Sequence, residues 1–204
     1  MTRLVLASAS PARLSVLRGA GLDPLVQVSD VDEDAVVAAL PADTPPETVV
    51  VELARAKARA VTDRLTGVED PVIVGCDSML LHNGALQGKP GTPQVAIQRW
   101  AAMAGTSAHL LTGHCLIRPW VGEAAACSTT TVHFANPTDA EIAAYVATGE
   151  PLAVAGSFTL DGLGGWFVDR IEGDPSSVIG IGLPLLRRLL REVGIGVTDL
   201  WVGR

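Results

Sequence analysis

Two oppositely charged residues in one short stretch are the first candidates for chemistry. Asp77 comes just after the apolar run Val72–Val74 and Gly75, and Lys89 follows shortly afterwards. The run predicts a buried strand that ends at Gly75. The carboxylate would then lie where a strand leaves a sheet, and open α/β sheets collect ligands there. Asn83–Gly84, between apolar runs, predicts a hairpin because both residues tolerate positive φ. This hairpin would bring Lys89 into the neighbourhood of Asp77.

The rarity of lysine in this chain points to Lys57 as a second candidate cation besides Lys89. Of the 15 basic residues, only Lys57 and Lys89 are lysines. A compact ammonium retained among so many arginines suggests a point charge that a planar guanidinium does not replace. Lys57 falls on or beside the apolar stripe of a helix predicted over 47–65, so it either snorkels or reaches into a site. The alternative is that Lys89 is a solvated surface charge and Asp77 caps a turn.

The N-terminal segment has the pattern of an anion site. A strand is predicted over 4–7 and a helix over 12–20, with Ser10 as its N-cap and Pro11 in its first turn. Free backbone N–H groups at such a helix start bind anions, and Arg13 could add a bidentate phosphate contact. A plain helix start with a surface arginine is the alternative.

Composition excludes several classes of protein. The 204 residues are 48% hydrophobic and 18% charged, which argues against disorder. The net charge of −7, without a basic run, disfavours duplex nucleic acid as a partner but allows an anionic metabolite. No stretch approaches about 20 apolar residues, so no membrane span is expected. Three cysteines without paired spacing predict a reducing, cytoplasmic location.

An acidic run follows a strand predicted over 24–28. Asp30, Asp32, Glu33 and Asp34 resemble the start of a calcium-binding EF-hand loop, but Ala35 stands where that loop needs glycine. The EF-hand interpretation therefore fails. An exposed acidic turn and a ligand for another metal both stay open.

The remaining elements mix strands and helices without strict alternation. Helices are predicted over 93–104, over 138–147 behind a Thr138–Glu141 capping box, and over 184–193; strands are predicted over 108–117, 124–134 and 166–171. The four histidines lack metal-site spacing and are interpreted as ordinary strand or loop residues. We predict a mixed sheet with flanking helices in one domain, residues 1–204.

Taken in order, these segments resemble the Maf family of nucleoside triphosphate pyrophosphatases. The resemblance covers nearly the whole chain, and the ordered set is far more specific than any one motif. It rests on LVLASASPARL (4–14), SDVDE (29–33), LARAKA (53–58), VGCDSML (74–80), LQGKP (86–90), LLTGHCLI (110–117), TDAEIAAYVATGEP (138–151), AGSFTLDGLGG (155–165) and IEGDPSSVIGIGLP (171–184).

The resemblance implies a long curved mixed sheet, a deep nucleotide-binding cleft and a possible homodimer. It implies hydrolysis of nucleoside triphosphates to monophosphate and pyrophosphate with Mg²⁺ or Mn²⁺. Positioned cations stabilise the charge that gathers at the phosphates. Whether Asp77 accepts a proton or mainly ligates the metal stays open. By motif, it implies phosphate binding by Ser8 and Arg13, triphosphate neutralisation by Lys57 and Lys89, metal binding by Glu33 and Asp77, and water activation by Asp77.

Three positions depart from the best-known family patterns. Ala12 precedes Arg13 where the family often has arginine or tryptophan, Ser78 replaces a frequent threonine, and Asp161 replaces a frequent glutamine. These positions track base selectivity, so the set typical of dTTP and UTP hydrolysis is incomplete and the base is left unnamed. Asp161 could accept a hydrogen bond from a base or cap a turn.

Two other functions compete with this interpretation. One is a nucleotide-binding regulator of cell division with little turnover. The other is an aspartyl-phosphate phosphatase, because LVQVSDVDED resembles the strand and DxD start of that class. A nucleophilic Ser8 or Ser10 lacks the G-x-S-x-G elbow of serine hydrolases.

Overall fold

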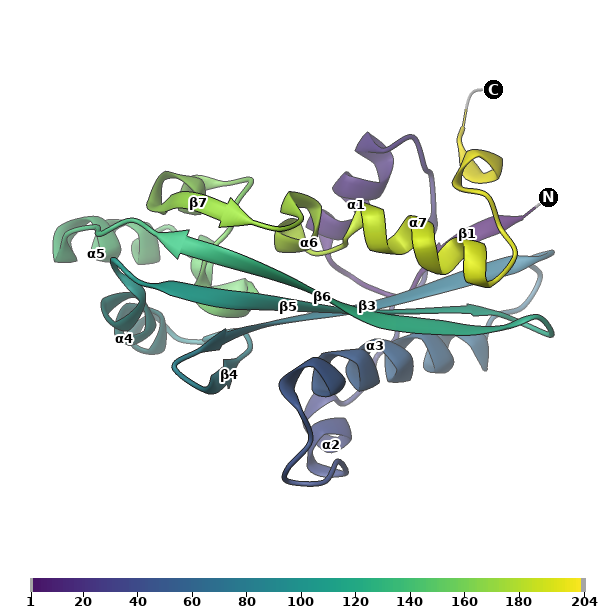
Figure 1. Cartoon of the computed structure of the whole chain (residues 1–204), viewed down its shortest axis with the longest axis horizontal. Coiled ribbons are helices and arrows are strands. Elements are labelled where there is room, and N and C mark those ends of the chain that lie inside the picture. The colour runs from purple at the N-terminus through teal and green to yellow at the C-terminus, as the bar shows by residue number, and fades with distance from the viewer. Residues whose placement is uncertain (1, 203–204) are drawn as a thin grey trace. The chain divides into compact units, whose positions relative to one another are not determined.

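The strands pair into one mixed sheet in the computed structural model, which describes residues 2–202. Within these residues the seven strands are β1 (Arg3–Leu6), β2 (Leu25–Val26), β3 (Pro71–His82), β4 (Ala85–Gln87), β5 (Ser107–Arg118), β6 (Gly122–Phe134) and β7 (Val168–Glu172). Their order is β2-β1-β3-β5-β6-β7, with β4 paired to β3. β1 is parallel to β2 and β3, whereas β3–β4 and β6–β7 are antiparallel. The predicted mixed α/β sheet is therefore confirmed (Figure 1).

The helices follow the predicted boundaries closely, with two additions. The α-helices are α1 (Pro11–Gly19), α2 (Glu33–Ala38), α3 (Pro46–Thr62), α4 (Pro93–Met103), α5 (Asp139–Ala147), α6 (Pro175–Ile179) and α7 (Leu183–Glu192). Short 3₁₀ segments cover Glu150–Ala153, Ala155–Ser157, Leu163–Phe167 and Val197–Leu200. The short helices α2 and α6 were not predicted. None of the helices in the part of the chain described is long and apolar enough to cross a bilayer.

By internal packing, the chain divides into two compact units. Unit 1 consists of residues up to Asp77, Thr112–Ser128 and residues from Gly180 onward, and unit 2 of Ser78–Leu111 and Thr129–Ile179. Strands β3, β5 and β6 each contribute residues to both units. The single-domain organisation over residues 1–204 stays a prediction.

In unit 1 the sheet is covered on both faces. On β1, Leu4 and Leu6 pack in a cluster with α1 and α7, whereas Val5 packs with α3. On β3, Val74 belongs to the first cluster and Ile73 to the second. Because side chains alternate along a strand, odd-numbered β3 residues face α3. Figure 1 shows α3 and α7 on opposite sides of these strands.

The strand predicted to end at Gly75 does not end there. β3 continues to His82, so the prediction that Asp77 lies at a strand end is wrong. Gly75 serves close packing instead: a Cβ at this position would lie 2.1 Å from the Ala54 carbonyl oxygen of α3. Gly113 of β5 has the same role, because its Cβ would lie 2.1 Å from the Val50 carbonyl oxygen. Gly75 thus lets α3 lie directly against β3, the strand that carries Asp77, and Gly113 lets the same helix lie against β5.

Unit 2 is built around an aromatic cluster. The Trp100 ring makes edge contacts with Phe134, Tyr145 and Phe167, with centroids 5.6–5.7 Å apart. Its indole N–H donates to the Ser157 carbonyl at 2.7 Å, which satisfies the polar atom of a fully buried side chain. The cluster packs α4, α5 and the 3₁₀ segments Glu150–Ala153 and Leu163–Phe167 against the strands.

Two local sequence patterns in unit 2 predicted the structure correctly, and one strand prediction was displaced. Asn83 and Gly84 have φ values of 49° and 76° and turn β3 into β4. Both hydrogen bonds of the Thr138–Glu141 capping box form at the start of α5. The strand predicted over 166–171 is shifted, because Trp166 lies in a 3₁₀ segment before β7 begins.

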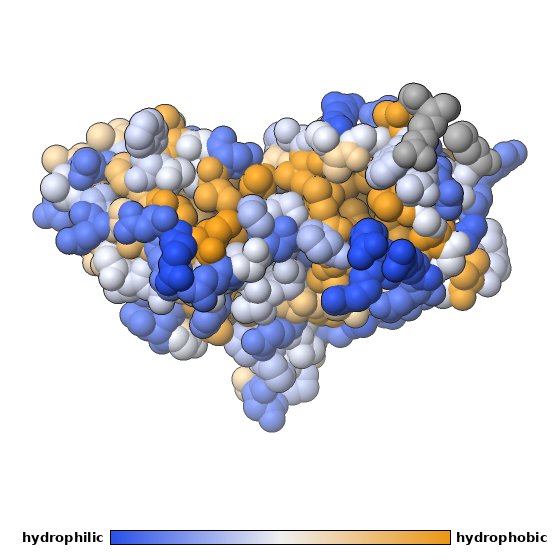
Figure 2. Space-filling view, turned by 45° about the horizontal axis from the view of Figure 1, so that its top comes forward, coloured by the Kyte–Doolittle hydropathy of each residue, from blue (hydrophilic) through white to orange (hydrophobic). Residues whose placement is uncertain are grey.

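Helix α7 separates apolar and basic residues. Leu185, Leu186 and Leu189 are buried in the unit 1 core, whereas Arg187 and Arg188 are exposed. The space-filling view shows strongly hydrophilic residues in the region of this helix, next to hydrophobic ones (Figure 2). This face therefore does not present one continuous basic surface.

Candidate active site

The ammonium group of one lysine contacts two carboxylates, and the three side chains come from separate elements of unit 1. The Nζ atom of Lys57 lies 2.5 Å from Asp77 Oδ1 and 2.7 Å from Glu33 Oε1. Lys57 and Asp77 are only 7% and 5% exposed, whereas Glu33 is exposed. Lys57 lies on the buried face of α3 and does not snorkel to solvent. The structure thus places three of the predicted site residues together.

The placement of these groups follows from the local structure. Asp77 is an odd-numbered β3 residue and therefore faces α3, with Gly75 one pleat before it. Glu33 is the first residue of α2, whose N-cap is Asp32; the Asp32 carboxylate accepts from the Ala35 N–H at 3.0 Å. The predicted acidic turn is thus the start of a short helix, and it delivers one carboxylate to Lys57.

Burial raises the pKa of the Asp77 carboxyl above its ordinary value. Lys57 and Arg13 act in the opposite direction, because their positive charges stabilise the carboxylate, but they only partly offset the loss of solvation. A carboxylate with a raised pKa is a stronger proton acceptor than an exposed aspartate.

A second pair of predicted residues lies at the start of α1. The Nη1 atom of Arg13 donates to Ser8 Oγ at 3.0 Å, and its Nε donates to the Gly180 carbonyl at 2.9 Å. Ser8 is buried and also accepts from the Ser10 N–H. Ser10 caps the helix by accepting from the Arg13 N–H, as predicted. The guanidinium is thus held in one orientation, close enough to Asp77 to influence its pKa.

The anchor of Arg13 was not predicted from sequence. Gly180 is 167 positions away, and nothing in its own type marks a carbonyl that will accept from an arginine. The spacing of Gly180 and Gly182 lies within IEGDPSSVIGIGLP (171–184), a run that served only for the family resemblance. That spacing was the one available signal that the backbone here approaches another element closely.

The remaining predicted residues are distributed over both units. Ala12 is half-buried on α1 in unit 1. Ser78 follows Asp77 on β3, Lys89 lies on the exposed loop after β4, and Asp161 is exposed between two 3₁₀ segments; all three belong to unit 2. Their association with the Lys57 cluster stays a prediction.

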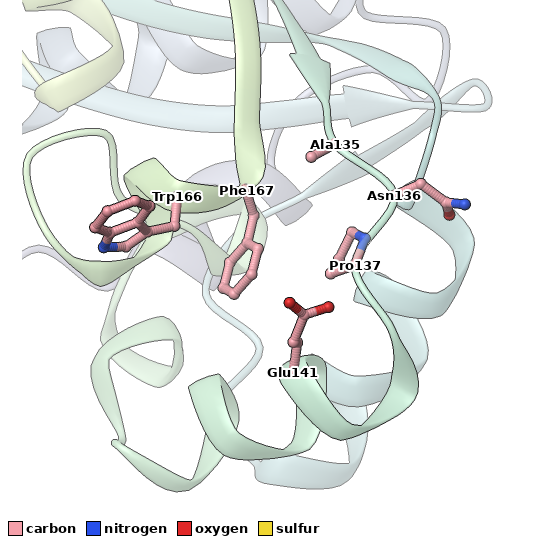
Figure 3. A pocket seen from close by; sticks show the side chains of 6 residues that line it. All are labelled: Ala135, Asn136, Pro137, Glu141, Trp166 and Phe167. Atoms are coloured by element: carbon pink, nitrogen blue, oxygen red, sulfur yellow. The ribbon is translucent and has the colours of Figure 1, made fainter.

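A pocket of about 370 Å³ in unit 2 contains none of the predicted site residues. It is lined by Ala135, Asn136, Pro137, Glu141, Trp166 and Phe167. Phe167 and Glu141 face its interior, whereas the Trp166 ring points away from it (Figure 3). The Glu141 carboxylate already accepts from the Thr138 backbone N–H and hydroxyl in the α5 capping box. We therefore do not assign the chemistry to this pocket.

The donor set at Lys57 suits a divalent cation that is shared with a substrate. No group of three or more metal-ligating side chains occurs among residues 2–202. Glu33 and Asp77 nevertheless both contact Lys57 Nζ and so lie close together, and Mg²⁺ is commonly held by one or two carboxylates together with substrate phosphates. The charges of Glu33, Asp77, Lys57 and Arg13 also cancel. These four groups alone would not neutralise a polyanion.

Comparison with known proteins decides the family. A family model described as "Maf-like protein" matches residues 3–193. The chain belongs to the Maf-like family. Its relatives include a nucleoside triphosphate pyrophosphatase of Nocardia farcinica, 71% identical over 97% of this chain and 96% of the relative. One from Rhodococcus opacus is 68% identical over 98% of this chain and 97% of the relative.

Membership of the Maf-like family confirms the resemblance seen in the sequence. A solved nucleoside-triphosphatase (dITP/XTP pyrophosphatase) from Mycobacterium abscessus covers 67% of this chain and 76% of its own, at 17% identity and a TM-score of 0.33. That likeness is too weak to support a comparison of sites.

Proposed function

We propose that this Maf-like protein hydrolyses nucleoside triphosphates to nucleoside monophosphates and pyrophosphate. The observation that carries the proposal is the buried Lys57 ammonium between two carboxylates, with the anchored guanidinium of Arg13 nearby. Buried cations held in fixed orientations stabilise phosphoryl charge without reorganising during the reaction. The names of the relatives from Nocardia and Rhodococcus support the same activity.

The residues divide into binding and reacting groups. Arg13 and Ser8 bind phosphate oxygens at the start of α1, where the helix dipole adds to the positive potential. Lys57 contributes a compact charge to the same phosphates, and Lys89 is proposed to add a second one. A nucleoside triphosphate carries close to four negative charges, so several cations are needed.

The reacting group is Asp77. The oxygen of a water molecule attacks the α-phosphorus, the bond from this phosphorus to the bridging oxygen breaks, and pyrophosphate leaves. Asp77 accepts a proton from the attacking water, for which its raised pKa suits it. The contribution of Asp77 as a metal ligand is the alternative role.

The proposed cofactor is Mg²⁺ or Mn²⁺. Glu33 and Asp77 would hold the ion, which would supply the positive charge toward a triphosphate that the neutral sum of the local groups lacks. When bound, such an ion neutralises phosphate charge and lowers the pKa of coordinated water. Lys57 then keeps both carboxylates oriented.

Substrate choice is proposed to depend on Ala12, Ser78 and Asp161. The exposed carboxylate of Asp161 suits a base that presents an N–H donor. Removal of non-standard or surplus nucleotides in the cytoplasm is the proposed role, and assembly as a homodimer stays a prediction.

Pyrophosphate release from a panel of canonical and modified nucleoside triphosphates, with Mg²⁺ or Mn²⁺, tests the proposal. Release should occur with at least one nucleotide and be lost in Asp77→Asn, while the far-UV circular dichroism is unchanged. Nucleotide binding without turnover would favour a regulator of cell division. Inorganic phosphate as the product would favour the aspartyl-phosphate class.

A further inference from the structure

A buried histidine on β5 has its protonation state fixed by its neighbours. His114 is fully buried in unit 1. Its Nε2 accepts from the Gly182 backbone N–H at 2.8 Å, and its Nδ1 lies 3.0 Å from the Thr112 carbonyl oxygen. A backbone N–H can only donate and a carbonyl can only accept. The ring is therefore neutral, with its proton on Nδ1 and an acceptor at Nε2.

Gly182, whose N–H donates to His114, lies two residues after Gly180, whose carbonyl accepts from Arg13. Gly180, Ile181 and Gly182 form the turn before α7, hereafter the 180–182 turn. The Gly180 carbonyl accepts from Arg13 Nε at 2.9 Å. The turn is thus tied to β5 at one end and to the guanidinium at the other.

Packing leaves this turn little freedom to shift. Ile181 is fully buried in the unit 1 core. Gly180 has a φ of 141°, and a Cβ at this position would lie 3.1 Å from Arg13 Cγ. A displacement of Gly182 would therefore be transmitted to the Arg13 side chain. The Gly182 N–H is buried, so losing His114 as its acceptor would cost the desolvation of this group.

We infer that His114 is a positioning residue for phosphate binding: by accepting from Gly182 it holds the 180–182 turn, whose Gly180 carbonyl orients the Arg13 guanidinium. The inference rests on the proposed function, because it assigns Arg13 to the substrate phosphates. It also gives a specific role to a residue that sequence analysis treated as an ordinary strand histidine.

Two amide substitutions separate positioning from structural support. His114→Gln places an amide oxygen near the position of Nε2, whereas His114→Asn reaches only the position of Nδ1. Both are neutral and polar. Affinity for an α,β-methylene nucleoside triphosphate, measured by calorimetry with Mg²⁺, should fall about tenfold in His114→Asn and stay within about threefold in His114→Gln, as for loss of one hydrogen bond. Leu190→Ala, at the far end of α7, controls for loss of stability alone.

A double-mutant cycle tests the route through Arg13. Arg13→Lys keeps the charge but removes the Nε that Gly180 holds. In that background His114→Asn should have no further effect on affinity, because the coupled link is already gone. Three results would overturn the inference. They are equal losses of affinity in His114→Asn and His114→Gln, wild-type affinity in His114→Asn, and losses for His114→Asn and Arg13→Lys that simply add in the double variant.

A measurement on the wild type keeps the inference testable if the variants fail to fold. The ¹⁵N signals of His114 should show an unprotonated Nε2 with a scalar coupling across the hydrogen bond to the Gly182 nitrogen. A protonated Nε2 would overturn the inference. Wild-type protein that neither binds the analogue nor releases pyrophosphate would instead contradict the proposed function.

Discussion

Lys57 and Asp77, from α3 and β3, form a buried ion pair with 2.5 Å between Nζ and Oδ1. Burying the two charges costs solvation free energy, which the pair regains only through close contact and further hydrogen bonds. The exposed Glu33 carboxylate supplies one such contact at 2.7 Å. This arrangement places the cation and the proposed proton acceptor in contact before a substrate arrives.

Lys57→Met is expected to lose activity and stability together. Removing the ammonium leaves the Asp77 carboxylate buried without its partner, which typically costs about 3–5 kcal/mol. Lys57→Arg should retain more stability but not activity, because the planar guanidinium does not fit the position of a compact charge. Thermal unfolding and pyrophosphate release measure the two effects.

The exposed Lys89 provides the comparison. Lys89→Met should change the free energy of unfolding by no more than about 0.5 kcal/mol, as is usual for a surface site. Its proposed contact with the triphosphate predicts a raised KM. Equal stability losses for Lys57→Met and Lys89→Met would contradict the assignment of Lys57 to a buried pair.

Gly75→Ala and Gly113→Ala are expected to be severely destabilising. Each added Cβ would lie 2.1 Å from a backbone carbonyl oxygen of α3, and a helix backbone cannot move aside as a flexible side chain can. We expect a loss of about 3 kcal/mol or more, the upper range for overpacking. Chemical denaturation measures it.

Gly19→Ala is the matched control. This glycine ends α1, and nothing lies within 4 Å of its added Cβ. Alanine there should be neutral or stabilise by up to about 1 kcal/mol, because alanine has the higher helix propensity. Similar losses at all three glycines would show that contact with α3 is not the cause.

Thiol labelling should distinguish the three cysteines. Cys76 and Cys115 are fully buried, and burial raises the pKa of both thiols to about 12. Because the thiolate is the reactive form, neither should react with a thiol reagent at neutral pH in the folded protein. Cys127 is only partly buried and should react first. Mass spectrometry after brief labelling identifies the site, and modification of Cys76 before Cys127 would contradict the packing of β3.

Glu150→Gln should alter how stability depends on pH. The Glu150 carboxylate accepts from Tyr145, Thr159 and the backbone N–H groups of Leu163 and Gly164. Burial acts to raise the pKa of Glu150, but these hydrogen bonds outweigh it and hold the pKa below the ordinary value. The unfolded chain therefore takes up a proton at a higher pH than the folded protein.

It follows that Glu150 stabilises the fold above the ordinary glutamate pKa, and that this contribution is lost as the pH falls through the lower folded value. The stability difference between wild type and Glu150→Gln should be largest at neutral pH and shrink in acid. Urea unfolding across that range measures it, and a difference that is constant with pH would contradict the assignment.

Local signals in the sequence predicted much of the fold. Asn83–Gly84 and the Thr138 capping box need only a few neighbouring residues to form, so short patterns were sufficient. The prediction of a strand end at Gly75 was wrong because the local sequence is the same whether the glycine ends the strand or lets a helix pack closely against it. Its actual role depends on Ala54, which lies on a different element.

The candidate site likewise combines features that the sequence predicts and features that only the packing of the elements determines. Residue types alone selected Lys57, Asp77 and Arg13, because charge and compactness are properties of single side chains, and the family motifs added Ser8 and indicated phosphate chemistry. Only the tertiary structure decided that Lys57 contacts both carboxylates and that Arg13 is held by Gly180. Hydrogen bonds and burial depend on which elements pack together, and the Gly180 carbonyl is a backbone group that every residue possesses.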